Sequence, residues 1–304
     1  MEYILQTHEV SKAFAGKKAV DCVSIAVRKA DIYGFIGENG AGKTTLMRMV
    51  CGLADPTGGE ILLYGSRDLV RQRRRMGCTI ENPALYPAMT ALENMKAQRL
   101  MLGIRDKTVC ADLLKTVGLA DTGRKKARDF SLGMKQRLMI ALALLGDPEF
   151  LVLDEPTNGL DPVGIKEVRD LLLRLNAERG ITIWISSHIL GELEKIATCY
   201  GVISRGKLVD EFRAEELNAR CGDRLAIRTN DAGKAEEILR GLFDGIRCEK
   251  LPDGTLCLPG HVEDAGRINE QLVKAGLAVS ALIPEGEKLE DYFMRLMGGE
   301  SGHA

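Results

Sequence analysis

A glycine-rich loop near the N-terminus restricts the fold of this chain more than any other feature. The loop reads Gly37-Glu38-Asn39-Gly40-Ala41-Gly42-Lys43-Thr44, which fits the pattern G-x-x-x-x-G-K-[ST]. An apolar run at 32–36 before it indicates a strand, and residues 43–52 after it indicate a helix closed by glycine. Glycines allow backbone N–H groups to approach a phosphate, and the helix adds the positive end of its dipole. The loop therefore predicts an α/β fold of the P-loop type that binds a nucleotide.

Two side chains of the loop and two carboxylates elsewhere predict hydrolysis of ATP. Lys43 can place its charge on the β- and γ-phosphates, and the Thr44 hydroxyl can ligate Mg²⁺. A buried strand predicted at 150–153 delivers Asp154 to its C-terminal end, where it can hold the Mg²⁺ shell. Glu155 is the natural general base for an attacking water. Taken alone, Asp154 could equally cap a helix or a turn; beside the loop it predicts a Mg-ATP site.

The first two thirds of the chain combine strands with a long helical stretch. Strands are predicted at 3–10, 20–27 and 181–185, with a hairpin at 200–209, whereas residues 91–146 have an almost entirely helical pattern. Asp161-Pro162 has the form of an N-cap followed by the first residue of a helix, which Gly180 ends. We therefore predict one ATPase domain over residues 1–220, with an antiparallel β subdomain and a helical subdomain at about 82–146.

Beyond residue 219 the pattern changes to a small α+β domain. The segments 224–228, 234–242, 246–251, 255–258, 265–275 and 279–283 are predicted in the order β-α-β-β-α-β, and a last helix at 289–297 follows. Pro252-Asp253-Gly254 is a suitable turn between the two middle strands. This order predicts a ferredoxin-like domain over residues 221–304, in which no residue pattern indicates chemistry.

The composition is that of a soluble globular protein and indicates neither a membrane span nor a nucleic-acid partner. The net charge is −1, and the longest apolar runs, 140–145 and 150–153, are too short to cross a bilayer. The basic clusters at 71–75 and 124–128 are interpreted as solvated faces. The N-terminus has no signal-peptide pattern. Eight cysteines without a C-x-x-C pair are interpreted as small core residues of a protein in a reduced cytosol.

Five motifs, in a fixed order, resemble those of the ATP-binding subunits of ABC transporters. They are GENGAGKTT at 37–45, FSLGMKQ at 130–136, LVLDEP at 151–156, NGLD at 158–161 and SSH at 186–188. The resemblance covers about residues 2–220. The tail KLEDYF at 288–293, followed by two glycines, looks more narrowly like the bacitracin-resistance and lantibiotic-immunity branch. In that branch too the signature begins Ser-Leu-Gly-Met.

The resemblance implies roles at the two halves of a composite site. Residues 37–45, which include Thr45, would bind ATP. Ser131, Leu132, Gly133 and Met134 would form the signature that contacts ATP on a partner subunit. Ser131 has the form of a helix N-cap, so exposed N–H groups behind it can reach a γ-phosphate. Phe130, Leu132 and Met134 depart from the common Leu-Ser-Gly-Gly-Gln signature, which puts the strength of that contact in question.

Four further residues have both a functional and a plain structural interpretation. Glu81 stands where the family usually has a glutamine; it could ligate Mg²⁺ or be an ordinary surface glutamate, and when ionised it cannot donate a hydrogen bond. His188 corresponds to the switch histidine that orients the attacking water, although a lone histidine is usually structural. Asp161 would contact the partner across the dimer or serve only as an N-cap. Phe14 would stack on adenine or be an ordinary core aromatic.

The resemblance implies an ATPase that drives export through a separate membrane permease. A homodimer would close around two Mg-ATP, with the helical subdomain docking the permease at the inner face of the membrane. The branch resemblance suggests a peptide antibiotic as cargo. An alternative is a regulatory module that binds ATP with little turnover, which intact Glu155 and His188 disfavour. A role on ribosomes or DNA is disfavoured too, because the chain has one cassette and no long coiled coil.

Overall fold

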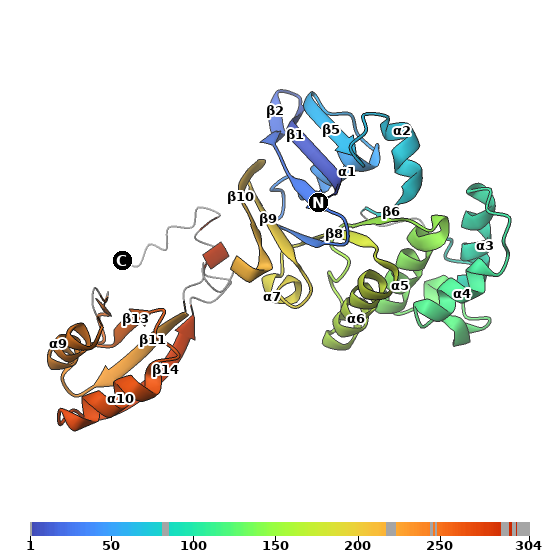
Figure 1. Cartoon of the computed structure of the whole chain (residues 1–304). Helices are drawn as coiled ribbons and strands as arrows, with labels where there is room; N and C mark the ends of the chain where they lie inside the picture. The colour runs from blue at the N-terminus through green and yellow to red at the C-terminus, as the bar shows by residue number, and fades with distance from the viewer. Residues whose placement is uncertain are drawn as a thin grey trace. The chain divides into compact units, whose positions relative to one another are not determined.

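The computed structural model divides the chain into two compact units, Met1–Arg213 and Ala214–Ala304 (Figure 1). It describes residues 2–80, 85–216, 223–243, 246, 248–286, 292, 293 and 296. Within this range no helix combines the length and the apolar composition needed to span a bilayer.

A six-stranded mixed sheet forms the centre of the first unit, in the order β10-β9-β4-β8-β7-β6. All neighbouring pairs are parallel except the β9–β10 hairpin at one edge. Because parallel strands end at the same edge, the residues that follow β4, β7 and β8 meet there. The strands are β4 (Ile32–Ile36), β6 (Met76–Thr79), β7 (Phe150–Leu153), β8 (Thr182–Ser187), β9 (Cys199–Ser204) and β10 (Lys207–Arg213).

A second, antiparallel sheet is built around the long strand β1 (Tyr3–Phe14). Its partners are β2 (Lys17–Val23), β3 (Ala26–Arg28) and β5 (Gly58–Leu63). The single strand predicted at 20–27 was wrong, since the chain divides it between β2 and β3. The Thr7 hydroxyl fills the break: it donates to the Val23 carbonyl at 3.0 Å and accepts from the Ile25 N–H at 2.9 Å. The hydrophobic periodicity of residues 20–27 could not reveal this break, because the side chain that makes it comes from another strand.

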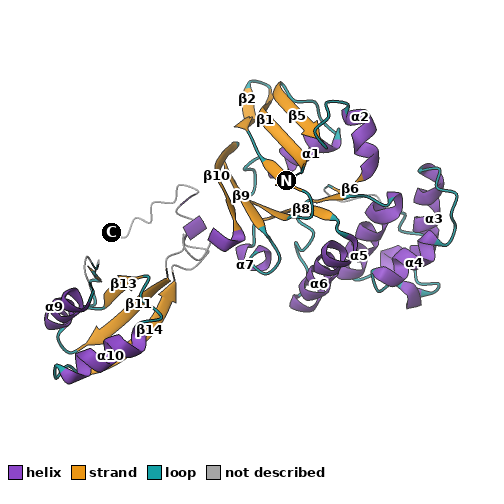
Figure 2. Cartoon of the chain, in the orientation of Figure 1, coloured by secondary structure: helices purple, strands orange, loops and turns teal. Residues whose placement is uncertain are grey.

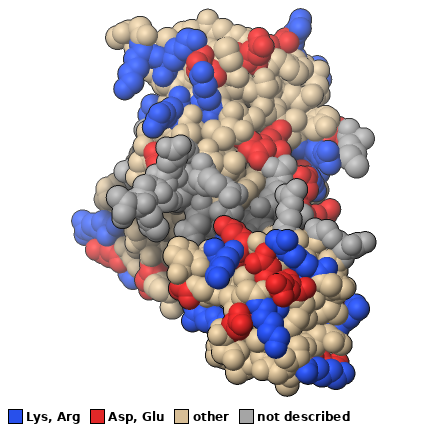
Figure 3. Space-filling view, turned by 90° about the vertical axis from the view of Figure 1, so that its left-hand side faces the viewer, with Lys and Arg blue, Asp and Glu red and all other residues tan. Residues whose placement is uncertain are grey.

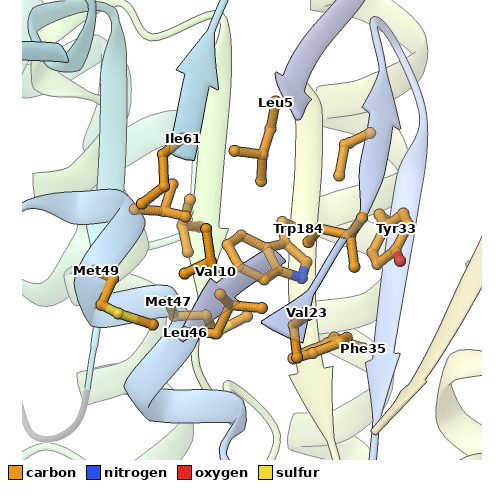
Figure 4. Packing of buried hydrophobic residues seen from close by; sticks show 14 of the residues in the cluster. Leu5, Val10, Val23, Tyr33, Phe35, Leu46, Met47, Met49, Ile61 and Trp184 are labelled. Carbon is orange, nitrogen blue, oxygen red and sulfur yellow. The ribbon is translucent and has the colours of Figure 1, made fainter. Parts of the chain in front are cut away.

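The helix α1 (Lys43–Cys51) packs the first unit together. Its buried residues Leu46, Met47, Met49 and Val50 belong to one cluster with side chains of both sheets, including Trp184 of β8 (Figure 4). Trp184 meets Phe35 edge to face, with ring centroids 5.6 Å apart. This packing fixes the helix whose first residues carry the phosphate-binding side chains.

Two arginines of the basic cluster at 71–75 are structural, which corrects their interpretation as solvated. The helix α1 ends at Gly52, which has φ 80°, and the guanidinium of Arg73 donates to the carbonyls of Met49 and Val50. Arg75 forms a bidentate pair with Glu149 and lies over the Tyr64 ring at 3.6 Å. Orphan carbonyls at a helix end need such donors.

The helical stretch predicted at 91–146 is confirmed, since α3, α4 and α5 all lie within it. Thr90 caps α3 with a capping box to Glu93, and Asp161 caps α6, whose first residue is Pro162 and whose C-cap is Gly180. The α-helices are α2 (Leu69–Gln72), α3 (Ala91–Met101), α4 (Val109–Thr116), α5 (Leu132–Ala143), α6 (Pro162–Arg179) and α7 (Leu190–Leu193). The 3₁₀ turns are Arg73–Arg75, Ala120–Thr122, Ala127–Asp129 and Leu144–Gly146, with Ala214–Glu216 beginning the second unit.

Among its described residues, the second unit contains an antiparallel sheet with the order β12-β13-β11-β14 and two helices of ten residues or more (Figure 2). This is the strand order of a ferredoxin-like fold. Its elements are β11 (Asp223–Thr229), α9 (Ala232–Leu242), β12 (Glu249–Lys250), β13 (Leu256–Pro259), α10 (Ala265–Lys274) and β14 (Val279–Gly286). The strand β12 is shorter than the predicted 246–251. The helix predicted at 289–297 lies mostly outside the described residues.

The second unit carries charges of both signs on its surface (Figure 3), and the cysteines of the two units differ in burial. On the face of the second unit seen in Figure 3, basic and acidic side chains are interspersed, so this face offers no uniformly positive surface to a nucleic acid. The interpretation of the cysteines as core residues holds for Cys110, Cys199 and Cys257. It is wrong for Cys22 and Cys78, which are exposed.

Candidate active site

The glycine loop lies between β4 and α1 and lines an open cavity. Gly40 has φ 82° and Gly42 has φ 109°, backbone conformations that residues other than glycine rarely adopt. A Cβ on Gly42 would also come within 2.5 Å of the Ala19 carbonyl. The cavity is lined by Ala19, Glu38, Asn39, Gly40, Gly42, Lys43, Thr44, Thr45 and Glu155. The predicted loop residues are thus gathered around one space together with the predicted base.

The Lys43 side chain is buried within the glycine loop, where it supplies a positive charge. Its Nζ donates to the carbonyls of Gly37 at 2.6 Å and Glu38 at 3.2 Å, and it lies 3.3 Å from Glu155 Oε1. Only 5% of its side chain is exposed. An ammonium held in so dry a setting interacts strongly with an anion, because little solvent screens it. The cavity therefore presents a fixed positive charge.

Thr44 and Asp154 meet directly, as expected of two residues that share one ion. The Thr44 hydroxyl donates to Asp154 Oδ2 at 2.7 Å. The other carboxylate oxygen, Oδ1, accepts from the Ser186 hydroxyl at 2.6 Å. A hydroxyl and a carboxylate are hard oxygen donors, and Mg²⁺ is usually held by one or two such groups plus waters and substrate phosphates. Among the described residues no group of three or more His, Cys, Asp or Glu could hold a metal alone, so this donor set fits Mg²⁺ shared with a nucleotide.

Glu155 is paired with His188 and stands on strained backbone. Its Oε2 lies 2.7 Å from His188 Nδ1. Its Oε1 is buried and lies 3.3 Å from Lys43 Nζ, and among the described residues it accepts no hydrogen bond with good geometry. Glu155 has φ 48°, which costs a non-glycine residue about 1–3 kcal/mol. The carboxylate thus lines the cavity on a residue whose backbone has an unfavourable left-handed conformation.

Ser186 is the functional residue whose role the sequence did not reveal. It lies in β8, beside the strand that ends before Asp154. Besides donating to Asp154, its oxygen accepts from the Glu155 N–H at 2.9 Å, so one hydroxyl holds both acidic residues. The signal was present in the SSH motif, because neighbouring parallel strands bring their carboxyl ends together.

The signature segment lies elsewhere in the first unit. Ser131 is the N-cap of α5, with Oγ accepting from Met134 N–H at 3.3 Å, and Leu132 is half exposed. A Cβ on Gly133 would lie 3.7 Å from Gly164 Cα, which places the signature beside the start of α6 that Asp161 caps. None of the residues that line the cavity belongs to the signature. The structure brings together the first half of the predicted site and leaves the second half facing outward.

Two predicted site residues stand apart. Phe14, the last residue of β1, is 52% exposed, so it is not an ordinary core aromatic. Lys12 Nζ lies 5.2 Å from its ring centroid, and the ring is free to receive another planar group. Glu81 lies outside the described residues.

We expect Ser186→Ala to lower kcat for ATP about tenfold and to raise the Mg²⁺ concentration needed for half-maximal activity. The variant removes hydrogen bonds to a carboxylate and to the Glu155 backbone, worth about 1.5–3 kcal/mol where a charge is involved. Steady-state ATPase assays over a Mg²⁺ titration measure both effects. Ser187→Ala is the control, since Ser187 is equally buried and its hydroxyl bonds only Ile189 in the described residues. Equal effects of the two variants would contradict a positioning role for Ser186.

Comparisons with known proteins agree with this geometry. A family model described as "ABC transporter" matches residues 20–158. The chain is 42% identical over 302 residues to the bacitracin transport ATP-binding protein BcrA of Bacillus licheniformis, covering 98% of this chain and 99% of that protein. It is 42% identical over 208 residues to the lantibiotic transport ATP-binding protein SrtF of Streptococcus pyogenes, covering 68% and 90%. A solved nucleotide-free ATP-binding cassette from an ABC transporter is similar at 27% identity, with a TM-score of 0.64, over 71% of this chain and 93% of that one.

Proposed function

The chain belongs to the ABC transporter family as an ATP-binding subunit with ATPase chemistry, and from this premise we propose that it works as a homodimer that powers export of a peptide antibiotic through a separate permease. One observation carries the ATP-hydrolysing part of the proposal. Glu155 is held between Lys43 and His188 at the mouth of a phosphate-binding loop, beside the Thr44–Asp154 pair.

The side chains of the site divide the work of hydrolysis among them. Lys43 and the loop N–H groups bind the β- and γ-phosphates and oppose the charge that grows on them. Thr44 and Asp154 would hold Mg²⁺, which would neutralise phosphate charge. Glu155 accepts the proton of the attacking water. His188 fixes Glu155 through Oε2 and orients the same water.

A second copy supplies what one chain does not bring to its own cavity. The Ser131 cap and the N-terminal turn of α5 face away from the loop, with Leu132 half exposed. N–H groups at a helix N-terminus bind anions well. In a two-fold dimer each Ser131–Met134 segment, with Asp161 beside it, would contact the γ-phosphate on the partner. Phe14, exposed at the end of β1, would stack on adenine.

The helical subdomain provides the surface for the permease. Its exposed apolar residues gather at the end of α3, where Leu100 is 68% exposed and Met101 is 72% exposed, with Leu102 next to them. Exposed apolar side chains that adjoin one another are typical of interaction sites. Docking there places the subunit at the cytoplasmic face of the membrane. The cargo proposal rests on the relatives named for bacitracin and lantibiotic transport.

The test compares antibiotic susceptibility of host cells that carry wild-type chain or Glu155→Gln at the native locus. We expect the variant to lower the minimum inhibitory concentration of bacitracin or of a lantibiotic at least fourfold, because export stops without ATP hydrolysis. Glu178→Gln, an exposed glutamate on α6, is the matched control and should leave susceptibility unchanged. Unchanged susceptibility of the Glu155→Gln cells to both peptides would refute the cargo. ATPase assays on the purified chain decide separately between a motor and a regulatory ATP-binding module.

A further inference from the structure

Two cysteines lie together beside the active-site helix. Cys51 is the last residue of α1 and packs against the main hydrophobic cluster. Cys78 is in β6 and pairs in register with Val152 of β7, which is a member of that cluster. Paired residues of neighbouring strands point to the same face of a sheet. Cys78 therefore faces α1, whereas Gly77 faces α5, with its Cβ position 2.2 Å from the Ala143 carbonyl.

The connection between α1 and β6 holds the two cysteines in place. Arg73 donates to two carbonyls at the end of α1, and β6 begins at Met76, only three residues after Arg73. The two thiols are close enough to shift each other's pKa. The neighbouring Cys51 thiol lowers the pKa of the Cys78 thiol to about 7. The neighbouring Cys78 thiol and burial raise the pKa of Cys51 well above its usual value.

The pair has the arrangement of a reactive cysteine and a resolving cysteine. Cys78 is exposed on an edge strand, so a small oxidant can reach it, whereas Cys51 is half-buried behind it. Susceptibility of a cysteine to oxidation follows its thiolate character and its exposure. Cys22 is also exposed, but it lies in β2, and its sulfur accepts from the Ser11 hydroxyl rather than from a thiol.

We propose that Cys51 and Cys78 form a peroxide-sensitive site, at which oxidation joins the end of the active-site helix to β6 and slows ATP turnover. The Cys78 sulfur attacks one oxygen of hydrogen peroxide; an S–O bond forms, the O–O bond breaks and water is released. The Cys51 sulfur then attacks the Cys78 sulfur; the S–S bond forms and the S–O bond breaks, releasing a second water with the Cys51 proton. Two thiols are oxidised to one disulfide, and peroxide is reduced to two waters.

A disulfide between Cys51 and Cys78 would constrain both α1, which carries catalytic residues, and β6, which leads to the helical subdomain. The helix α1 begins with Lys43 and Thr44, so its far end becomes covalently fixed to the sheet. The strand β6 leads through residues 80–90 to α3 and the helical subdomain. The effect on turnover rests on the proposed ATPase function, whereas the disulfide itself does not.

The experiment treats the purified full-length chain with hydrogen peroxide, digests it with trypsin under non-reducing conditions and measures ATPase activity in parallel. Cleavage after Arg48 and after Arg75 gives two peptides that hold one cysteine each, Cys51 and Cys78. We expect these peptides to appear linked, and ATPase activity to fall at least fivefold and to recover with dithiothreitol. Cys78→Ser and Cys51→Ser should resist the loss, and Cys22→Ser should behave as the wild type.

The outcomes separate the thiol chemistry from the proposed function. Absence of the linked peptides, or inhibition that persists in Cys78→Ser, overturns the proposal. Linked peptides with unchanged turnover overturn its regulatory part. If the reduced wild type does not hydrolyse ATP at all, the proposed function fails instead, and the linked peptides, with ATP affinity measured before and after peroxide, still decide the inference.

Discussion

Glu155→Gln is expected to lower steady-state ATP hydrolysis by about 10²-fold or more while ATP still binds. The amide keeps the size of the side chain but cannot accept the proton of the attacking water, and positioned bases contribute about 10²–10⁴-fold. The backbone at φ 48° and the Ser186 contact to the Glu155 N–H are unaffected by the change. Steady-state turnover with Mg-ATP, beside a titration with a fluorescent ATP analogue, measures the two properties separately.

Light scattering adds a second readout to this variant. If two chains close around ATP and reopen after hydrolysis, the slow variant accumulates as a dimer in ATP but not in ADP. The control is Glu178→Gln, which removes a carboxylate from the exposed face of α6. Turnover in Glu155→Gln within threefold of the wild type would contradict the assignment of the base. A wild type that binds ATP but hydrolyses no faster than the variant would point to the regulatory module.

Lys43→Met is expected to weaken ATP binding by about 10²-fold. The methionine keeps most of the apolar stem and removes a buried ammonium, whose loss leaves phosphate charge unopposed; breaking a buried pair costs about 3–5 kcal/mol, and each 1.4 kcal/mol is tenfold in affinity. The same ammonium lies 3.3 Å from Glu155, so the variant also leaves that carboxylate without its cation. Fluorescence titration with an ATP analogue gives the affinity directly.

A surface lysine provides the control for this loss. Lys115→Met removes an exposed charge near the end of α4, where a single charge contributes little, so its affinity for ATP should match the wild type. Thermal unfolding with and without ATP checks the result independently, because a ligand that binds only the folded state raises the midpoint. ATP affinity of Lys43→Met within twofold of the wild type would exclude Lys43 from phosphate binding.

The predictions that came from local chemistry were the most successful. The strand-loop-helix order around the glycine loop, the arrival of Asp154 at the end of a buried strand and the caps at Asp161 and Gly180 all follow from near-neighbour rules. The element order of the second unit could be predicted for the same reason, because a turn signal separates its middle strands. Family resemblance added the meaning of the signature and of His188, which no local rule supplies.

The errors concern side chains that act across long sequence separations. Thr7 divides the strand predicted at 20–27, and Arg73 caps a helix more than twenty residues before it. Ser186 holds two acidic residues that lie some thirty positions away. Exposure of Cys78 depends on its place in an edge strand, which follows from strand order and not from composition. Contacts made by a second chain likewise leave no periodic pattern in the first.

The left-handed backbone at Glu155 has a consequence for how this site can change over generations. Glycine would adopt that conformation at no steric cost, so every mutation from glutamate to glycine there would recover part of the 1–3 kcal/mol held in the bend. A lineage under pressure only to stay folded would drift in that direction and lose its base. A Glu155→Gly change would relieve the bend and remove the base together, so stability and turnover make opposite demands on this one residue.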